Sequence, residues 1–159
     1  MITEQQKTNR KTMIQEARAR LMNNHIHAGH RFVSSASPPC LCAVGTLAVS
    51  WLLLQDPHLE IPNPRHVEDF AEACAFFGGT AEDGIRGSAY QLLGKEAGWS
   101  WEEVQAIETM YEGYPGHSDL EQRAYAWFLR QGPSARKRLL NLLQVLEDID
   151  DGPLTLPEI

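Results

Sequence analysis

The sequence predicts an all-α protein, a single compact domain over residues 1–159 with about six helices around one central apolar helix at residues 38–55. Three observations lead to this prediction. Helix-capping residues recur along the chain, apolar residues between them repeat at spacings of three and four, and the run from Leu41 to Leu54 is apolar nearly all round. A chain of this length can form one domain with a substantial core.

The composition is that of a globular protein with an acidic surface. Hydrophobic residues make up 43% of the chain and charged residues 22%, the net charge is −7, and the isoelectric point is near 5.3. Nucleic acids and anionic membranes bind basic surfaces, so we expect neither direct nucleic-acid binding nor a membrane partner. Residues 1–31 differ, with six Lys and Arg against two Glu. This basic segment either pairs with the acidic remainder or forms a second partner surface.

The cysteines and the hydropathy of the chain favour a cytoplasmic protein. Three cysteines cannot all pair, which argues against a disulfide framework and favours a reducing compartment. The N-terminus is polar through Arg10 and shows no signal-peptide pattern. The apolar run from Leu41 to Leu54 is too short to span a bilayer.

A helix is predicted at the beginning of the chain. Thr3 with Gln6 matches the capping-box pattern, and the helix should end near Met22. Its apolar stripe is narrow, so we expect residues 1–12 to fray.

The central helix follows an irregular loop at residues 25–37. Ser37 matches an N-cap, and Pro38 and Pro39 would occupy the first helical turn, where a missing N–H group costs nothing. Gly45 is a weak helix former that is tolerated where another backbone packs closely.

Cap residues followed by apolar periodicity predict the remaining helices. The clearest signal is Ser100 as N-cap, with Glu103 at the third helical position and Trp99 and Val104 at the hydrophobic-staple positions. The acidic side chains of this helix argue against a DNA-reading helix-turn-helix, which needs basic or amide side chains there. The predicted helices cover residues 63–77, 80–97, 100–111, 118–131 and 134–147, and residues 150–159 should form an extended tail.

One segment, residues 24–51, concentrates the side chains that bind metals. Imidazole and thiolate are the commonest zinc ligands, so the segment contains a candidate zinc site. Its five candidate ligands are His25, His27, His30, Cys40 and Cys42. Zinc ligands usually come in pairs separated by two or more residues, a spacing that H-x-H and C-x-C do not match. We therefore expect no cofactor, with zinc as the alternative.

The same segment allows two other interpretations. Cys40 would lie just inside the central helix N-terminus, where the helix dipole lowers a thiol pKa and makes the thiol reactive. Pro38 and Pro39 weaken this interpretation, because they remove two N–H donors from that helix end. In the simplest interpretation Cys42 is a buried apolar residue and the histidines lie in a solvated loop.

Two groups of residues are candidates for a protein-binding surface. One is the acidic helix that two tryptophans flank, and the other is the beginning of the last helix, where three cations oppose the helix dipole. These candidates are Trp99, Trp101, Glu102, Glu103, Glu108, Glu112, Arg136, Lys137 and Arg138. The simpler interpretations are a solvated helix face and core packing of the tryptophans.

A short part of the chain resembles a known family. Gly29-His30 followed by Cys42-Ala43-Val44-Gly45-Thr46-Leu47 resembles the Gly-aromatic…Cys-x-x-Gly-Ala-Leu element of a small, uncharacterised helical domain family of actinobacteria and their phages. His30 stands where that family has Trp, and Thr46 where it has Ala. The resemblance implies no activity, and it favours a cytoplasmic helical protein that a phage or mobile element encodes.

These observations predict a non-enzymatic protein that binds another macromolecule through an acidic helical surface. No motif in the chain identifies a particular chemical reaction. The expected partner is another protein, a basic or nucleic-acid-binding one, and a phage- or mobile-element-encoded inhibitor would match the pattern. Self-association is left open, and a zinc- or thiol-dependent site at His25–Cys42 is the alternative.

Overall fold

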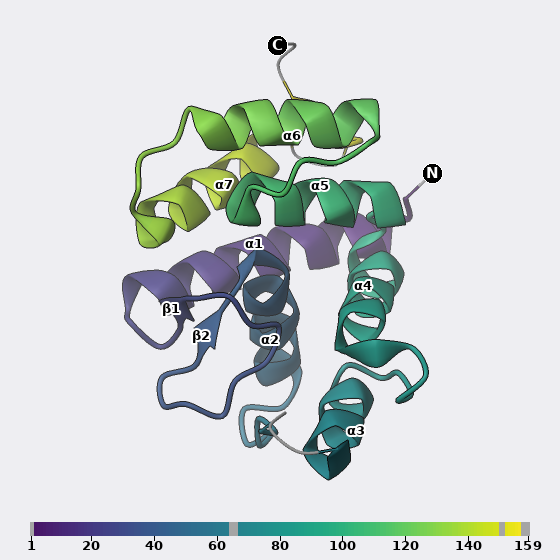
Figure 1. The fold of residues 1–159 in the computed structure, drawn as a ribbon. Helices are drawn as coiled ribbons and strands as arrows, with labels where there is room; N and C mark the ends of the chain where they lie inside the picture. The colour runs from purple at the N-terminus through teal and green to yellow at the C-terminus, as the bar shows by residue number, and fades with distance from the viewer. Residues whose placement is uncertain (1, 64–66, 150–151, 157–159) are drawn as a thin grey trace.

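The structure, a computed structural model, describes residues 2–63, 67–149 and 152–156, and it is all-α as predicted. In these ranges the chain has seven helices, one for each of the seven helical segments predicted above, and two short strands (Figure 1). In chain order they are α1 (Glu4–Met22), β1 (His27–Ala28), β2 (Cys40–Leu41), α2 (Ala43–Gln55), α3 (Val67–Phe76), α4 (Gly84–Ala97), α5 (Trp101–Glu112), α6 (Asp119–Leu129) and α7 (Ala135–Ile149). No helix in these ranges is long and apolar enough to cross a membrane.

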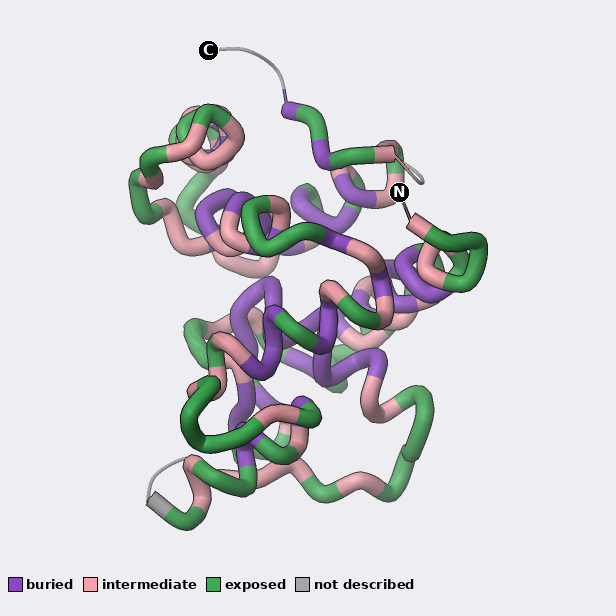
Figure 2. Tube along the Cα trace, turned by 90° about the vertical axis from the view of Figure 1, so that its right-hand side faces the viewer, coloured by how far each residue is buried: buried purple, intermediate pink, exposed green. Residues whose placement is uncertain are grey.

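The helices lie on both sides of α1, which crosses the middle of the molecule (Figure 1). On one side are α5, α6 and α7, and on the other are α2 and α4, with α3 packed against α4. Every residue of α2 from Ala43 to Trp51 is buried, and the buried segments gather where the elements meet (Figure 2). The prediction of a central apolar helix is confirmed.

The predicted beginning of this helix at Pro38 is wrong. The strand β2 pairs in parallel with β1, so its backbone groups bond across the ladder instead of along a helix. The N–H of Cys42 donates to the carbonyl of Arg31 at 2.8 Å. The helix therefore begins at Ala43, and Cys42 is its N-cap, with Sγ accepting the N–H of Gly45 at 3.4 Å.

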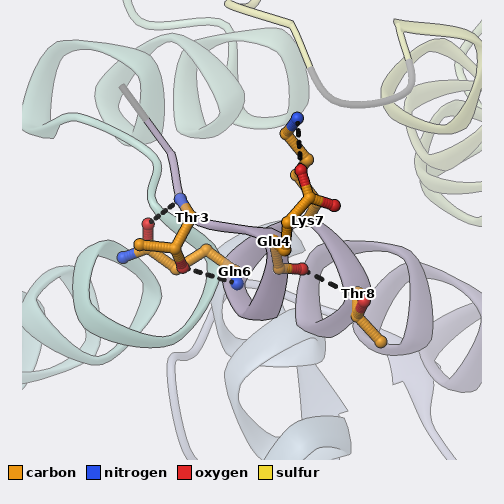
Figure 3. Close-up of polar contacts among 5 residues, drawn as sticks. All are labelled: Thr3, Glu4, Gln6, Lys7 and Thr8. Atoms are coloured by element: carbon orange, nitrogen blue, oxygen red, sulfur yellow. Dashed lines mark hydrogen bonds and ion pairs between the residues drawn. The ribbon is translucent and has the colours of Figure 1, made fainter.

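The capping box predicted for the first helix is confirmed. The N–H of Gln6 donates to Thr3 Oγ1 and the N–H of Thr3 donates to Gln6 Oε1, each at 3.0 Å (Figure 3). We expected residues 1–12 to fray, but residues 4–12 are helical and Arg10 is 3% exposed. Packing of this helix against its neighbours explains the difference, because buried side chains hold a helix end that sequence alone leaves weak.

Side chains of α1 also cap the C-terminal end of α4. The last carbonyl groups of a helix have no donor within the helix, so they need partners from elsewhere. Gln6 Nε2 donates to the carbonyl of Lys95 at 3.1 Å, Asn9 Nδ2 to that of Glu96 at 2.9 Å, and Arg10 Nε to that of Ala97 at 3.1 Å. The two helices are therefore joined by polar bonds as well as by apolar packing.

The capping box predicted at Ser100 is confirmed as well. Ser100 and Glu103 exchange both bonds, at 2.9 and 3.1 Å, and the second carboxylate oxygen of Glu103 accepts the N–H of Leu154 at 2.7 Å. Leu154 and Leu156 are buried, so residues 152–156 pack against the domain. The rest of the predicted tail, at 150–151 and 157–159, and residues 64–66 of the helix predicted at 63–77 lie outside the described residues.

Candidate functional site

The structure separates the side chains of the candidate zinc site. His25, His27, His30 and Cys40 are exposed, and Cys42 is buried. The strand ladder pairs His27 with Cys40, whereas His30 Nδ1 lies 3.0 Å from Glu112 Oε2. Within residues 2–63, 67–149 and 152–156, no three His, Cys, Asp or Glu side chains form a group that could hold a metal ion. The zinc alternative stays a prediction that this arrangement does not support.

The Cys42 side chain has a structural role. Burial raises the pKa of its thiol to about 12, against the opposing hydrogen bond from the N–H of Gly45. The prediction that Cys42 is buried is confirmed. Cys40 lies in β2 and not inside a helix N-terminus, so the helix-dipole argument for a reactive thiol at this position is wrong.

We expect Cys40 to be the thiol that reacts in the folded protein. With a pKa of about 12, only about one in 10⁴ Cys42 side chains is a thiolate near pH 8, and Cys74 is also buried. Titration with DTNB should label one thiol rapidly, and the other two only after denaturation. Mass spectrometry should place the fast label on Cys40, and rapid labelling of Cys42 would contradict the prediction.

Glu112 and Arg138, two of the candidate interaction residues, belong with Tyr111 to the contacts that hold the loop after β1 against α5. The hydroxyl of Tyr111 donates to the carbonyl of Gly29 at 2.8 Å, and burial raises the Tyr111 pKa, which keeps this donor protonated. Glu112 pairs with His30, and Arg138 Nε donates to the carbonyl of Tyr111 at 2.8 Å. Glu112 and Arg138 therefore have partners within the protein.

The remaining candidates are divided between the core and the surface. Trp99 is 3% exposed and belongs to the core, and Glu103 caps α5. Arg136 is half-buried, and Trp101, Glu102 and Lys137 are exposed.

The exposed ring of Trp101 is held against α4 by a network of side chains. Its ring packs on Tyr90 with centroids 4.6 Å apart, although the residue is 50% exposed. The hydroxyl of Tyr90 donates to the carboxylate of Glu108. The guanidinium of Arg86 lies 5.1 Å from the Tyr90 ring centroid, and its Nε is 3.4 Å from Glu108 Oε2. These contacts fix the orientation of an exposed tryptophan.

The surroundings keep the Tyr90 hydroxyl protonated and the Arg86 guanidinium charged. Burial, followed by the hydrogen bond to Glu108, raises the pKa of Tyr90 well above its usual range, so the hydroxyl remains a donor. Burial alone would lower the pKa of Arg86, but the hydrogen bond to Tyr90 and the charge of Glu108 outweigh it and raise the pKa. Arg86 therefore stays charged near neutral pH.

A pocket of about 300 Å³ opens beside the network. Its lining residues are Arg86, Gln105, Glu108, Thr109, Tyr114, Pro115 and Glu121. Tyr114 is 66% exposed, and two carboxylates face one guanidinium in the lining. We call the surface formed by Trp101 and this pocket, over the buried Tyr90, the Trp101 face.

Further carboxylates lie beside Trp101. Glu102 follows it in the chain and is exposed. A Cβ atom built at Gly87 would lie 3.6 Å from Asp83 Cβ and 4.0 Å from the Trp101 ring. Asp83 and the Trp101 ring therefore lie on the same side of α4, the side of Gly87. Two carboxylates outside the pocket, those of Asp83 and Glu102, therefore lie near the tryptophan.

Only part of this face was predicted from the sequence. Trp101 and Glu108 were candidates, but the residues that orient them, Arg86 and Tyr90, were missed, as was the pocket carboxylate of Glu121. Trp101, Gln105 and Glu108 have the i, i+4, i+7 spacing of one helix face, a signal that could have identified the α5 side.

No protein-family model, no curated protein and no solved structure matches this chain. The resemblance of the Gly29 and Cys42 region to a family of actinobacterial and phage helical domains therefore stays a prediction.

Proposed function

We propose that this is a non-enzymatic interaction protein and that its Trp101 face binds a basic segment of another protein. The observation that carries this proposal is the half-exposed Trp101, held by Tyr90 beside a pocket with two carboxylates. Tryptophan and tyrosine are enriched among the residues that contribute most binding energy in interfaces. A cation above a tryptophan ring is attracted by its π-electrons, so an Arg or Lys side chain suits both features.

Charge favours a basic protein over a nucleic acid as the partner. The carboxylates near Trp101 outnumber the single guanidinium of Arg86, and the whole chain carries −7. Such a surface attracts a cationic segment and repels phosphates. A protein that covers a basic segment prevents that segment from binding anything else, which is how this protein would act as an inhibitor.

Trp101→Ala should weaken the binding of a fluorescein-labelled hexa-arginine peptide by about tenfold or more, because it removes the aromatic anchor. The Kd is measured by fluorescence anisotropy at about 0.15 M salt, where general charge attraction is screened. Glu121→Gln should weaken binding by about threefold, because it removes one pocket carboxylate.

Met22→Ala is the matched control for this experiment. Met22 is also an exposed apolar residue, 56% exposed, but it lies at the end of α1. Its substitution should change the Kd by less than about twofold, and a hexa-glutamate peptide should not bind. Equal losses for Trp101→Ala and Met22→Ala, or no binding of hexa-arginine by the unaltered protein, would rule out the Trp101 face.

A further inference from the structure

A second pocket, of about 290 Å³, lies where the end of α1, the strand β1 and the beginning of α7 meet. Its lining residues are Leu21, Asn24, Ile26, His27, Ala28, Ala135 and Arg136. Leu21 and Ile26 are each 1% exposed and form an apolar floor. Arg136, His27 and Asn24 provide polar groups around it. We call this cavity the Arg136 pocket.

The charge around the Arg136 pocket is opposite to that of the whole protein. All its lining residues come from two segments, 17–55 and 122–146, and neither segment contains an Asp or Glu. The two segments together hold eight Lys and Arg and three His, in a chain of net charge −7. The pocket therefore lies in the positive part of an acidic protein.

Within the described residues, two acidic side chains of the helices that meet at the pocket pair with arginines other than Arg136. Glu16 pairs with Arg20 at 3.1 Å, and Glu147 pairs with Arg18. Within the described ranges, the hydrogen bond of the Arg136 guanidinium is a long one, 3.5 Å from Nη1 to the carbonyl of Leu21. A guanidinium has five N–H donors in a planar fork, so most of its donors remain available to a ligand.

We propose that the Arg136 pocket binds a small organic oxyanion, a phosphate monoester or a carboxylate. The oxyanion would accept two parallel bonds from Arg136, the geometry in which guanidinium groups recognise both kinds of anion. Its apolar part would lie on Leu21 and Ile26. The volume of about 290 Å³ is at the lower end of ligand pockets, which limits the ligand to about the size of one substituted ring.

The proposal is tested with phenyl phosphate, benzoate, inorganic phosphate and benzyl alcohol as probes. Binding is followed by ¹H–¹⁵N correlation spectra of the full chain. Both aromatic anions should shift the amide signals of His27, Ala28 and Ala135, and the tighter one identifies the preferred oxyanion. Benzyl alcohol lacks the charge and should not bind, and inorganic phosphate lacks the apolar part and should bind more weakly than phenyl phosphate.

Arg136→Gln should weaken the binding of the preferred anion by about tenfold or more, because it removes the bidentate partner. Lys137→Gln is the matched control, because it removes the neighbouring exposed cation, which does not line the pocket, and it should change the Kd by less than about twofold. Equal losses in the two variants would show that the anion responds only to general surface charge and would overturn the proposal. The proposal would also be overturned if neither aromatic anion shifted these amide signals in the unaltered, folded protein.

Discussion

Gly45→Ala should lower the free energy of unfolding by about 3 kcal/mol, the upper end of the usual range for overpacking a core. A Cβ atom at this position would lie 2.4 Å from the carbonyl oxygen of Phe32 and 2.8 Å from that of Arg31. Both contacts are with backbone, which cannot turn aside as the end of a side chain can. Because the carbonyl of Arg31 also accepts the N–H of Cys42, displacing the loop would disturb the beginning of the central helix.

Thermal and urea denaturation measure this effect, and Gly94→Ala is the control. For a domain of this size a loss of about 3 kcal/mol corresponds to a Tm lower by roughly 6–12 °C. Gly94 lies within α4, and its nearest atom beyond the helix backbone, the Trp99 carbonyl oxygen at 3.4 Å, is at ordinary contact distance. Gly94→Ala should therefore stabilise the protein by about 0.5–1 kcal/mol through helix propensity. A Gly45→Ala variant as stable as the unaltered protein would show that the loop yields without cost.

Features that depend on neighbouring residues were predictable from the sequence. The capping boxes at Thr3 and Ser100 each join residues three apart, so they can be recognised from the sequence alone. The burial of residues Ala43 to Trp51 of α2 follows from a run of apolar residues around the whole helix. The tolerance for Gly45 was also expected, and the loop carbonyl groups are the backbone that packs against it.

Features that depend on distant pairings were not predictable in this way. Pro38 and Pro39 resemble the first turn of a helix, but the ladder between β1 and β2 determines where α2 begins. The Trp101 face also depends on a contact between residues that are distant in the sequence. Its acidic helix was recognised, but the packing of Tyr90 on Trp101 joins two helices whose approach the sequence does not encode locally.

The basic residues near the N-terminus illustrate how structure decides between two interpretations. They either pair with the acidic remainder or form a partner surface, and the described contacts hold three of them within the protein, one of which, Arg18, pairs with a carboxylate of the acidic remainder. Arg18 pairs with Glu147 and Arg20 with Glu16. Arg10 is buried, and its Nε and Nη1 donate to the carbonyl groups of Ala97 and Gly152 at 3.1 and 2.8 Å.

Arg10→Ala should therefore lower the free energy of unfolding by about 3 kcal/mol, because hydrogen bonds from a charged group contribute about 1.5–3 kcal/mol each and their loss leaves buried carbonyl groups unpaired. The substitution also removes the guanidinium that lies 4.9 Å from the centroid of the Trp99 ring. Arg10→Lys should recover little of this loss, because one ammonium group does not reproduce the fork that reaches both carbonyls.

Lys11→Ala is the matched control, since this exposed cation is the next residue of α1 and its loss should change stability by less than about 0.5 kcal/mol. Urea denaturation of the three variants measures the comparison. A large loss of stability for the Arg10 variants alone means that the basic residues of this segment serve bonding within the protein. The docking surface must then lie elsewhere. Similar small effects at both positions would contradict this interpretation and would make the basic segment a partner surface again.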